Sequence, residues 1–261
     1  MHPGIQARLD RIGTDGRIVN VPMDHGISIG ATEGLRDIEA TIDAVTRGGA
    51  DCVLTQKGLA PRVHGNRNGA GYVVHVNGST AIGPDSNDKR LTGTAVEAVR
   101  AGADAVSFHI NVGSDHEPNQ IEDLAALTRE AHDLGLPVLA MTYARGPGID
   151  EHDAESLAHA VRIGEELGAD LMKTAFSRDD RFGEVTGATG KPVIVAGGSP
   201  RDDRTMLQQV RDAMDMGADG VSMGRSVFQH DDPETITRAV AGIVHDDLGV
   251  DAAAERAELP L

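Results

Sequence analysis

Three side chains whose types suit carbonyl chemistry lie in or after apolar segments that are typical of buried strands. Lys173 lies in the run Leu171–Thr174, and Tyr143 and Asp24 follow two other runs of this kind. A lysine amine attacks a carbonyl carbon only when it is unprotonated, and desolvation among apolar neighbours favours that neutral form. The iminium that forms is an electron sink, so the pattern predicts cleavage or formation of a carbon–carbon bond beside a ketone. Tyr143 and Asp24 can donate and accept the protons that move in such a reaction.

Each of these residues also has a purely structural interpretation. Lys173 can pair with a carboxylate at a strand end, Tyr143 can be an amphipathic aromatic residue there, and Asp24 can cap a loop. The chain has only four lysines, at positions 57, 89, 173 and 191. Because a buried lysine is costly unless it is used, we favour the catalytic interpretation of Lys173 and leave the other two residues open.

Short apolar runs that alternate with amphipathic stretches must position these side chains. The runs predict eight strands, at Ile18–Met23, Cys52–Gln56, Tyr72–Val76, Ala105–Ile110, Val138–Thr142, Leu171–Thr174, Val193–Ala196 and Gly220–Met223. The stretches predict helices at Gly34–Arg47, Thr94–Ala101, Pro118–Leu134, Asp153–Leu167, Arg201–Met216 and Pro233–Val244. This alternation indicates parallel βαβ units, and an eight-stranded barrel takes about 250 residues. We therefore expect an α/β protein with a (β/α)8 TIM-barrel fold, in one domain that spans residues 1–261.

A repeated tripeptide supports this organisation. Gly-Ala-Asp occurs at 49–51, 102–104, 168–170 and 217–219, each time between a predicted helix and a predicted strand. Glycine at that junction suits a left-handed helix cap. Chance does not readily explain four occurrences at the same kind of junction, even in a chain with 32 glycines.

The ends of the predicted strands carry most of the candidate residues. In a barrel of this kind the active site lies at the C-terminal ends of the strands. Besides the three residues above, the residues at these ends are His25, Gly26, Lys57, His109, Asn111, Arg145, Gly197, Gly198, Gly224 and Arg225. The long irregular stretch Asn77–Leu91 follows the third strand and is a candidate active-site loop.

Glycines after the last two strands predict an anion site. Gly197 and Gly198 follow the seventh strand, and Gly224 and Arg225 follow the eighth. Barrel enzymes often bind phosphate at these two loops and at the start of a short extra helix, which Ser226–His230 can form. The alternative is that both segments are ordinary turns.

The charge of the chain is strongly acidic. There are 41 Asp and Glu residues against 24 Lys and Arg, which gives a formal net charge of −17. Nucleic acids and anionic membranes need basic surface, so neither is an expected partner. The acidic, lysine-poor composition is typical of proteins from salt-loving organisms, and a merely acidic cytosolic protein is the alternative. The single cysteine and the lack of a long apolar run favour a cytoplasmic location.

Three histidines raise the alternative of a metal-dependent reaction. His25, His75 and His109 all fall on or after predicted strands, where they can in principle bind zinc. No local pattern such as HExxH accompanies them, and strand histidines are more often hydrogen-bonded rim residues. We therefore expect no metal and no cofactor.

The motifs taken together resemble the archaeal class I aldolase family. They are Pro22–Gly26, Tyr143–Gly146, the strand that ends around Lys173, Gly197–Gly198 and Gly224–Arg225. The likeness runs from about residue 8 to residue 245. It implies a (β/α)8 fold and a Schiff-base reaction on a sugar phosphate. It also implies a homo-oligomer, because related enzymes form rings of dimers such as decamers.

The resemblance also implies a role for each matching position. Lys173 matches the Schiff-base lysine, Tyr143 the proton donor and Asp24 an acid that contacts substrate and helps proton transfer. Gly197, Gly198, Gly224 and Arg225 match the phosphate site. The other substrate-contacting positions that it implies are His25, Gly26, Ile27, Ser28, Ala144 and Arg145.

The segment Met141–Gly146 is similar to one branch of that family, the 2-amino-3,7-dideoxy-D-threo-hept-6-ulosonate synthases. Ala144 departs from the proline that is common there, and the chain lacks the tryptophan that the fructose-bisphosphate aldolase branch tends to carry near this tyrosine. The synthases transfer a fragment of 6-deoxy-5-ketofructose 1-phosphate from lysine to L-aspartate semialdehyde, and hydroxypyruvaldehyde phosphate leaves. The product feeds an alternative route to 3-dehydroquinate and aromatic amino acids.

Two other functions stay open at this point. A class I fructose-1,6-bisphosphate aldolase uses the same machinery on a different ketose. A non-catalytic barrel that only binds a phosphorylated ligand would leave Lys173 and Tyr143 without a chemical task.

Overall fold

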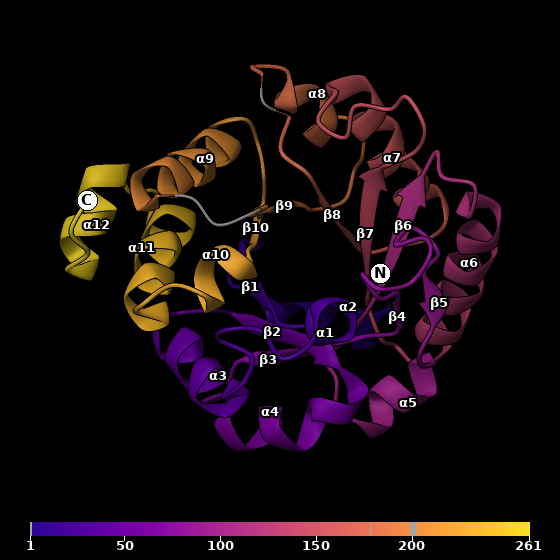
Figure 1. Cartoon of the computed structure of the whole chain (residues 1–261), viewed down its shortest axis with the longest axis horizontal. Coiled ribbons are helices and arrows are strands. Elements are labelled where there is room, and N and C mark those ends of the chain that lie inside the picture. The colour runs from indigo at the N-terminus through magenta and orange to yellow at the C-terminus, as the bar shows by residue number, and fades with distance from the viewer. Residues whose placement is uncertain (1, 178, 199–201) are drawn as a thin grey trace.

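The protein folds into a closed barrel of eight parallel strands surrounded by helices (Figure 1). The computed structural model describes residues 2–177, 179–198 and 202–261. The barrel strands are β1 (Ile18–Pro22), β2 (Cys52–Gln56), β3 (Gly71–His75), β6 (Ala105–Val112), β7 (Val138–Ala144), β8 (Leu171–Thr174), β9 (Val193–Ala196) and β10 (Gly220–Ser222). The predicted (β/α)8 fold and all eight predicted strands are confirmed.

One helix for each strand covers the outside of the barrel (Figure 1). These helices are α3 (Ile38–Arg47), α4 (Ala60–Asn66), α5 (Ala95–Arg100), α6 (Glu117–Asp133), α7 (Ala154–Glu166), α8 (Phe182–Thr186), α9 (Asp203–Asp215) and α11 (Pro233–Asp246). The other elements are α1 (Pro3–Ile12), α2 (Gly26–Ile29), η1 (Lys57–Leu59), α10 (Arg225–Phe228), α12 (Val250–Ala257) and the antiparallel pair β4 (Asn77–Gly78) and β5 (Arg90–Leu91).

Most predicted helices are present, with ends that differ by a few residues. The helix predicted from Gly34 begins at Ile38, because the side chain of Asp37 accepts a hydrogen bond from the backbone N–H of Ala40 and caps the first turn. Helices α1, α4 and α8 were not predicted. The start predicted at Arg201 lies outside the described residues, and α9 begins at Asp203. Helix α12, near the end of the chain, packs against α9 and α11.

Strands β6 and β7 extend two residues beyond their predicted ends. Their extra residues pair with one another, Asn111 with Tyr143 and Val112 with Ala144. Tyr143 therefore lies within a strand, where its side-chain direction is fixed by the pleat, and does not follow the strand as predicted.

The barrel closes between its first and last strands. Ile18 of β1 is in register with Gly220 of β10, whose φ is +144°. A Cβ at Gly220 would lie 2.0 Å from the backbone oxygen of Ile18, so only glycine permits this approach.

The Gly-Ala-Asp repeats have a structural role at these strand junctions. Their glycines all have positive φ, between +74° and +103°, as predicted for helix caps. Each aspartate accepts a hydrogen bond from a backbone N–H in the neighbouring strand. The pairs are Asp51 with Val19, Asp104 with Tyr72, Asp170 with Val138 and Asp219 with Val193. The repeats therefore tie strands together in pairs.

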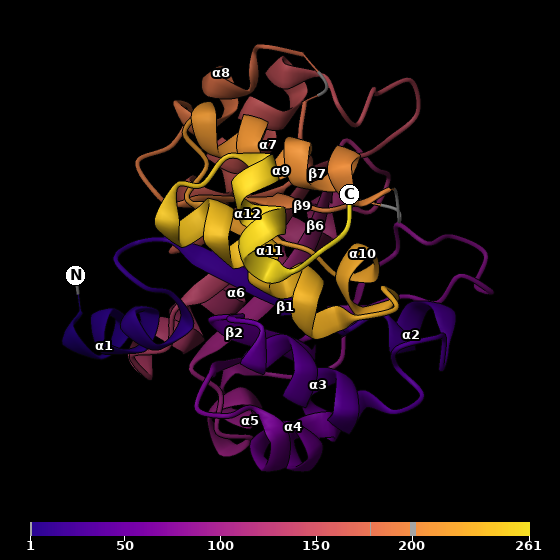
Figure 2. The same ribbon diagram turned by 90° about the vertical axis from the view of Figure 1, so that its left-hand side faces the viewer.

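The two ends of the barrel are covered differently. Figure 2 shows α1 at one end, and α2 and α10 at the opposite end. Helix α1 lies against the start of β3. The two are so close that a Cβ at Gly71 would lie 2.4 Å from the backbone oxygen of Arg11. The carboxyl ends of the strands, with α2 and α10, form the other end, where catalytic residues of such barrels lie.

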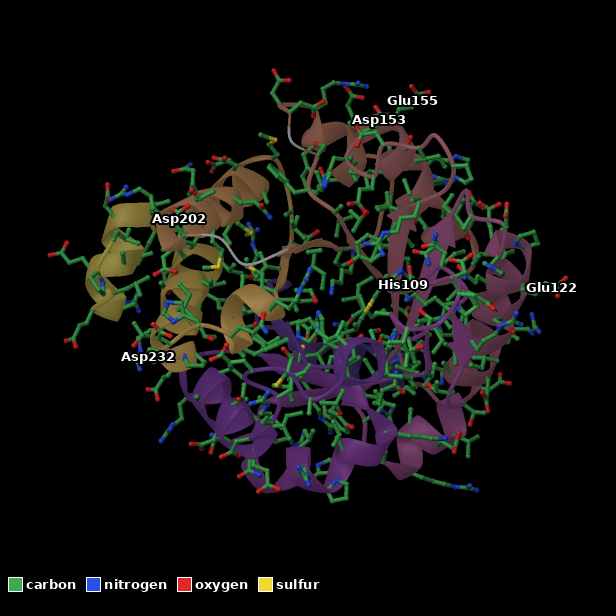
Figure 3. The ribbon with its side chains drawn as sticks, in the orientation of Figure 1. His109, Glu122, Asp153, Glu155, Asp202 and Asp232 are labelled. Atoms are coloured by element: carbon green, nitrogen blue, oxygen red, sulfur yellow. The ribbon has the colours of Figure 1, made fainter. Side chains whose placement is uncertain are left out.

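Acidic residues gather on the outer helices. Figure 3 places Glu122, Asp153, Asp202 and Asp232 around the outside of the ring, while His109 lies near its centre. Asp153, Asp202 and Asp232 each cap the first turn of a helix through a backbone N–H three residues later. Among the described residues, no helix is long and apolar enough to cross a membrane.

Candidate active site

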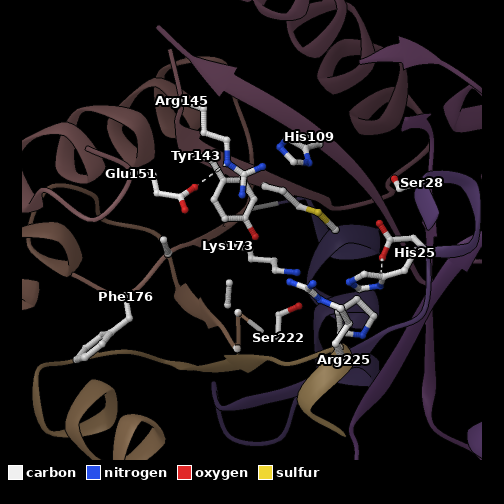
Figure 4. A pocket seen from close by; sticks show the side chains of 18 of the residues that line it. His25, Ser28, His109, Tyr143, Arg145, Glu151, Lys173, Phe176, Ser222 and Arg225 are labelled. Carbon is white, nitrogen blue, oxygen red and sulfur yellow. Dashed lines mark hydrogen bonds and ion pairs between the residues drawn. The ribbon is translucent and has the colours of Figure 1, made fainter. Parts of the chain in front are cut away.

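The carboxyl ends of the strands surround a cavity of about 510 Å³ (Figure 4). Side chains along a strand alternate between its two faces, so every second residue points to the same side. Met141, Tyr143 and Arg145 follow this rule at the end of β7, and all three line the cavity. Lys173 of β8 and Asp24, just after β1, line it as well. The three residues singled out from the sequence therefore share one cavity.

Lys173 is held by the barrel itself. It is paired with Met141 of β7 on one side and Ile194 of β9 on the other, and its side chain is 6% exposed. Figure 4 shows its amine near the middle of the cavity. An amine fixed in this way can meet the carbonyl carbon of a ligand without reorganisation of the chain.

Tyr143 lies between two basic side chains. The guanidinium carbon of Arg145 is 4.3 Å from the centroid of its ring, and the centroid of the His109 ring is 4.9 Å away. His109 is fixed by a hydrogen bond of 2.8 Å to the Oδ1 of Asn111. Burial, and then the charges of Lys89 and Arg145, lower the pKa of His109 well below its usual value, so that the ring is neutral at pH 7.

Asp24 is the centre of a buried polar cluster. Its two oxygens lie 3.5 Å from His25 Nδ1 and 3.8 Å from His75 Nε2. Burial by itself would raise the pKa of Asp24, but the charges of His75, His25 and Lys173 outweigh it and lower the pKa. Asp24 is therefore an anion at neutral pH and can accept a proton.

His75 supports Asp24 from within the barrel. Its Nδ1 is 2.7 Å from the hydroxyl oxygen of Ser107, which fixes the ring. Burial lowers the pKa of His75 to about 4, although Asp24 opposes that shift. The pKa of His25 is also lowered, by burial first and then by Lys173 and Arg225.

The predicted anion site lies at the same cavity. Gly197, Gly198, Gly224 and Arg225 all line it, and the predicted short helix is α10. A Cβ at Gly197 would lie 2.8 Å from the hydroxyl oxygen of Ser226, so a larger residue would close this corner. Among the described residues, that buried hydroxyl has no hydrogen-bond partner, so it can still donate a hydrogen bond. Ser199, at the edge of the predicted loop, lies outside the described residues.

Three predicted substrate contacts do not line this cavity. Ala144 is next to Tyr143 in β7 and therefore points to the outer face of the barrel, where it is buried. Gly26 and Ile27 begin α2 and line a second, smaller cavity with Lys57, and Asp24 lines both cavities. Of the remaining contacts, Ser28 and His25 do line the main cavity.

Several polar residues at the cavity were not predicted as part of the site. They are Lys89, Glu151, His152, Gln209 and Ser222. Lys89 lies in the segment between β4 and β5, which the sequence marked as a candidate active-site loop. Glu151 and His152 follow β7 by several residues, and no pattern in the sequence indicates where that loop turns.

The three strand histidines do not form a metal-binding group. His25 and His75 approach Asp24, whereas His109 is bonded to Asn111. Across residues 2–177, 179–198 and 202–261, no three His, Cys, Asp or Glu side chains are arranged to hold a metal ion. The zinc alternative gains no support from this arrangement.

Known proteins with the same fold and similar sequence are aldolases and related synthases. A 2-amino-3,7-dideoxy-D-threo-hept-6-ulosonate synthase from Halobacterium salinarum is 62% identical over 257 residues, which cover 98% of this chain and 97% of the relative. A second relative, 2-amino-3,7-dideoxy-D-threo-hept-6-ulosonate synthase 1 from Archaeoglobus fulgidus, is 39% identical over 253 residues, which cover 97% of this chain and 95% of the relative. A solved Schiff-base-forming fructose-1,6-bisphosphate aldolase is 30% identical, covers 92% of this chain and 100% of the other, and superimposes with a TM-score of 0.86.

A family model extends this likeness across the barrel. The model of the DeoC/LacD family of aldolases matches residues 18–230, from the first residue of β1 to the end of α10 and just beyond. The match includes every strand of the barrel and all residues of the candidate site. This chain belongs to the DeoC/LacD family of aldolases.

Proposed function

We propose that this protein catalyses the transaldol reaction of a 2-amino-3,7-dideoxy-D-threo-hept-6-ulosonate synthase, with Lys173 as the Schiff-base nucleophile. The reaction takes 6-deoxy-5-ketofructose 1-phosphate as the donor and L-aspartate semialdehyde as the acceptor. The observation that carries the proposal is the convergence of Lys173, Tyr143 and Asp24 in one cavity of the barrel. The relative of 62% identity, which carries this synthase's name, supports the choice of substrates.

The first step is condensation of the Lys173 amine with the C5 ketone of the donor. The amine adds to the carbonyl carbon and the resulting carbinolamine loses water, which leaves an iminium. Tyr143, which lines the same cavity, is the proposed donor of the proton that the departing oxygen needs. Because strand β8 holds Lys173 in place, only the substrate has to be oriented for the reaction.

The second step breaks the bond between C3 and C4 of the donor. Its electron pair moves into the iminium and forms an enamine, and the C3 hydroxyl loses its proton as C3 becomes an aldehyde. Asp24, an anion in the folded protein, accepts that proton. The phosphate departs with the C1–C3 fragment as hydroxypyruvaldehyde phosphate, and the methyl-ketone half stays on Lys173.

The third step joins the enamine to the acceptor. The enamine carbon attacks the aldehyde carbon of L-aspartate semialdehyde, and the new alkoxide takes back the proton. Water then hydrolyses the iminium, which releases the product and restores the Lys173 amine. The same two proton carriers, Tyr143 and Asp24, therefore act in both directions.

The donor phosphate is proposed to bind at the glycines after β9 and β10. Gly197, Gly198, Gly224 and Arg225 line this part of the cavity, with the buried hydroxyl of Ser226 next to Gly197. Arg225 is the proposed main donor to the phosphate. A charge-assisted hydrogen bond from an arginine is worth about 1.5–3 kcal/mol, which is enough to dominate the placement of the donor.

A class I fructose-1,6-bisphosphate aldolase is the second candidate. It is supported by the solved aldolase of 30% identity and TM-score 0.86. The two activities separate in one assay. Incubation with 6-deoxy-5-ketofructose 1-phosphate and L-aspartate semialdehyde gives the seven-carbon amino acid only in the synthase, whereas fructose 1,6-bisphosphate gives triose phosphates only in the aldolase. Triose phosphate release at the higher kcat/KM would overturn the proposal.

We further propose that the protein is a cytoplasmic homo-oligomer, as the family resemblance implies. Exposed apolar side chains at the mouth of the barrel support an interface. Ile29 and Ile82 are 48% and 98% exposed, and their segments are joined by a hydrogen bond from the backbone N–H of Ala81 to the oxygen of Ser28. Light scattering in high salt tests this, and a monomer mass would contradict it.

A further inference from the structure

A second cationic wall lines the cavity apart from the predicted phosphate loops. Lys89, from the segment between β4 and β5, and Arg145, from the end of β7, both face the cavity. Neither lies in the segments after β9 and β10 that hold Gly197, Gly198, Gly224 and Arg225. Figure 4 shows Arg145 beside Tyr143 and Arg225 on the other side of the Lys173 amine. The reacting centre therefore lies between two separate groups of cationic side chains.

The Lys89 amine is held in place by a hydrogen bond and is partly buried. Its amine donates a hydrogen bond of 2.7 Å to the hydroxyl of Ser79, which in turn donates to the backbone oxygen of Ser86. Burial, and then the charge of Arg145, lower the pKa of Lys89. The two cations are therefore close enough to repel one another. The carboxylates of Asp24 and Asp85 oppose this shift but do not cancel it, so an incoming anion would relieve the remaining repulsion.

Arg145 brings a carboxylate of its own to the same wall. Its Nε lies 3.1 Å from Glu151, and the two side chains are 35% and 48% exposed. An ion pair this exposed contributes at most about 1 kcal/mol, so a ligand can open it at little cost. Glu151 also lines the cavity. The wall therefore offers two cations and one anion side by side.

This arrangement matches the two charges of an α-amino acid. A carboxylate is satisfied by Lys89 and Arg145, whose planar guanidinium can bind it in bidentate fashion. An ammonium group beside that carboxylate is satisfied by Glu151. The phosphorylated ketose has no ammonium group, and a second phosphate would be repelled by Glu151. The acceptor aldehyde of the proposed reaction carries both charges.

We propose that Lys89, Arg145 and Glu151 form the subsite that binds the α-amino carboxylate end of the acceptor aldehyde. The proposal rests on the proposed transaldol function and adds the residues that select the acceptor. It gives Arg145 two tasks, because its guanidinium also lies over the ring of Tyr143. A bound acceptor would thereby hold its aldehyde end toward the reacting centre and its charged end toward the loop between β4 and β5.

Three aldehydes test the subsite. L-Aspartate semialdehyde has both charges, succinate semialdehyde has the carboxylate alone, and propanal has neither. In the wild type, kcat/KM should decrease in that order. Lys89→Met should reduce the preference for succinate semialdehyde over propanal by about 10-fold or more, as expected for loss of one charge-assisted hydrogen bond. Lys89→Arg should restore most of it. Glu151→Gln should reduce only the preference for L-aspartate semialdehyde over succinate semialdehyde.

Two further measurements separate this proposal from the function on which it rests. Borohydride trapping with the ketose alone reports the Schiff base, and both the wild type and Lys89→Met should be trapped at Lys173. Lys191→Met, two residues before β9 and at the opposite end of the barrel, is the matched control and should keep the wild-type preferences. If borohydride traps Lys89→Met and Glu151→Gln but both keep the wild-type preferences among the three aldehydes, the subsite is overturned and the proposed function stands. A raised KM for the ketose in Lys89→Met would overturn it too, since that result places the phosphate at Lys89. Absence of trapping in the wild type would overturn the proposed function itself.

Discussion

Arg145 places its guanidinium carbon 4.3 Å from the centroid of the Tyr143 ring, and both residues line the same face of strand β7 and its end. Such a contact is attractive because the ring face carries negative charge, and it strengthens when water is excluded. The ring of His109 packs nearby, at a centroid distance of 4.9 Å. The phenol is therefore held by its ring, which leaves its hydroxyl available to the substrate.

Tyr143→Phe should keep the ring contacts and remove only the hydroxyl. If that hydroxyl transfers protons, kcat should decrease by about 10²–10⁴-fold, the usual worth of a general acid or base. The melting temperature should change little, because the ring and Arg145 stay in place. Steady-state kinetics and thermal unfolding of the two proteins measure both effects. A variant with wild-type kcat would show that Tyr143 is a structural aromatic residue of the barrel rim.

Arg225→Met should weaken binding of the phosphorylated donor. Loss of one charge-assisted hydrogen bond predicts a rise in KM for the ketose of about 10- to 100-fold, with a smaller effect on kcat. Arg162→Met on helix α7 is a suitable control, since that arginine pairs with Glu166 at the surface. An unchanged KM in the first variant would place the phosphate elsewhere in the cavity.

The barrel and the central site residues could be predicted because both depend on local patterns. Apolar runs mark the strands, and the carboxyl ends of parallel strands must meet, which brings Lys173, Tyr143 and Asp24 together. The resemblance implies that Ala144 contacts substrate, but the pleat turns its side chain away from the cavity, so the contact stays a prediction for its backbone alone.

Loop residues escaped prediction for a different reason. The loop that holds Lys89 was marked as a candidate from the sequence, but which of its side chains reaches the cavity depends on tertiary contacts and not on periodicity, and the same holds for Glu151. The short helix α2 places Gly26 and Ile27 at a second cavity, and their contact with substrate stays a prediction. Helix α4 has only seven residues and contains Pro61 and Gly65, so its pattern is too short to indicate a helix.

His75 should make the stability of the fold depend on pH. Its pKa is about 4 in the folded protein, against 6.5 for an ordinary histidine. Below pH 6.5 the unfolded chain therefore takes up a proton that the folded chain excludes. The contribution of His75 to the free energy of unfolding is therefore complete above pH 6.5. It decreases by about 3 kcal/mol as the pH falls to about 4.

Denaturant titrations between pH 7 and pH 4 measure that slope. His75→Asn should show a shallower loss of unfolding free energy over this range than the wild type. Some slope should persist, because the pKa values of His25 and His109 are also lowered and contribute with the same sign. Identical slopes in the two proteins would mean that His75 is protonated as readily in the folded chain as in the unfolded one.

Salt should stabilise the protein if its acidity is an adaptation. The excess acidic side chains, which give a net charge of −17, repel one another over about 10 Å in 0.1 M salt and over about 3 Å in 1 M salt. Screening should therefore raise the melting temperature by about 5–10 °C between 0.1 and 2 M KCl, which corresponds to a few kcal/mol for a chain of this size. A flat or decreasing melting temperature would favour the alternative of an ordinary acidic protein.

The most direct test of the central proposal is borohydride trapping in high salt with EDTA, followed by peptide mass mapping. The protein is incubated with 6-deoxy-5-ketofructose 1-phosphate or with fructose 1,6-bisphosphate, and Lys173→Ala is the control. We predict a reduced adduct on Lys173, formed faster with the first ketose and absent from the variant. No adduct with either ketose, from protein shown to be folded, would contradict the Schiff-base mechanism.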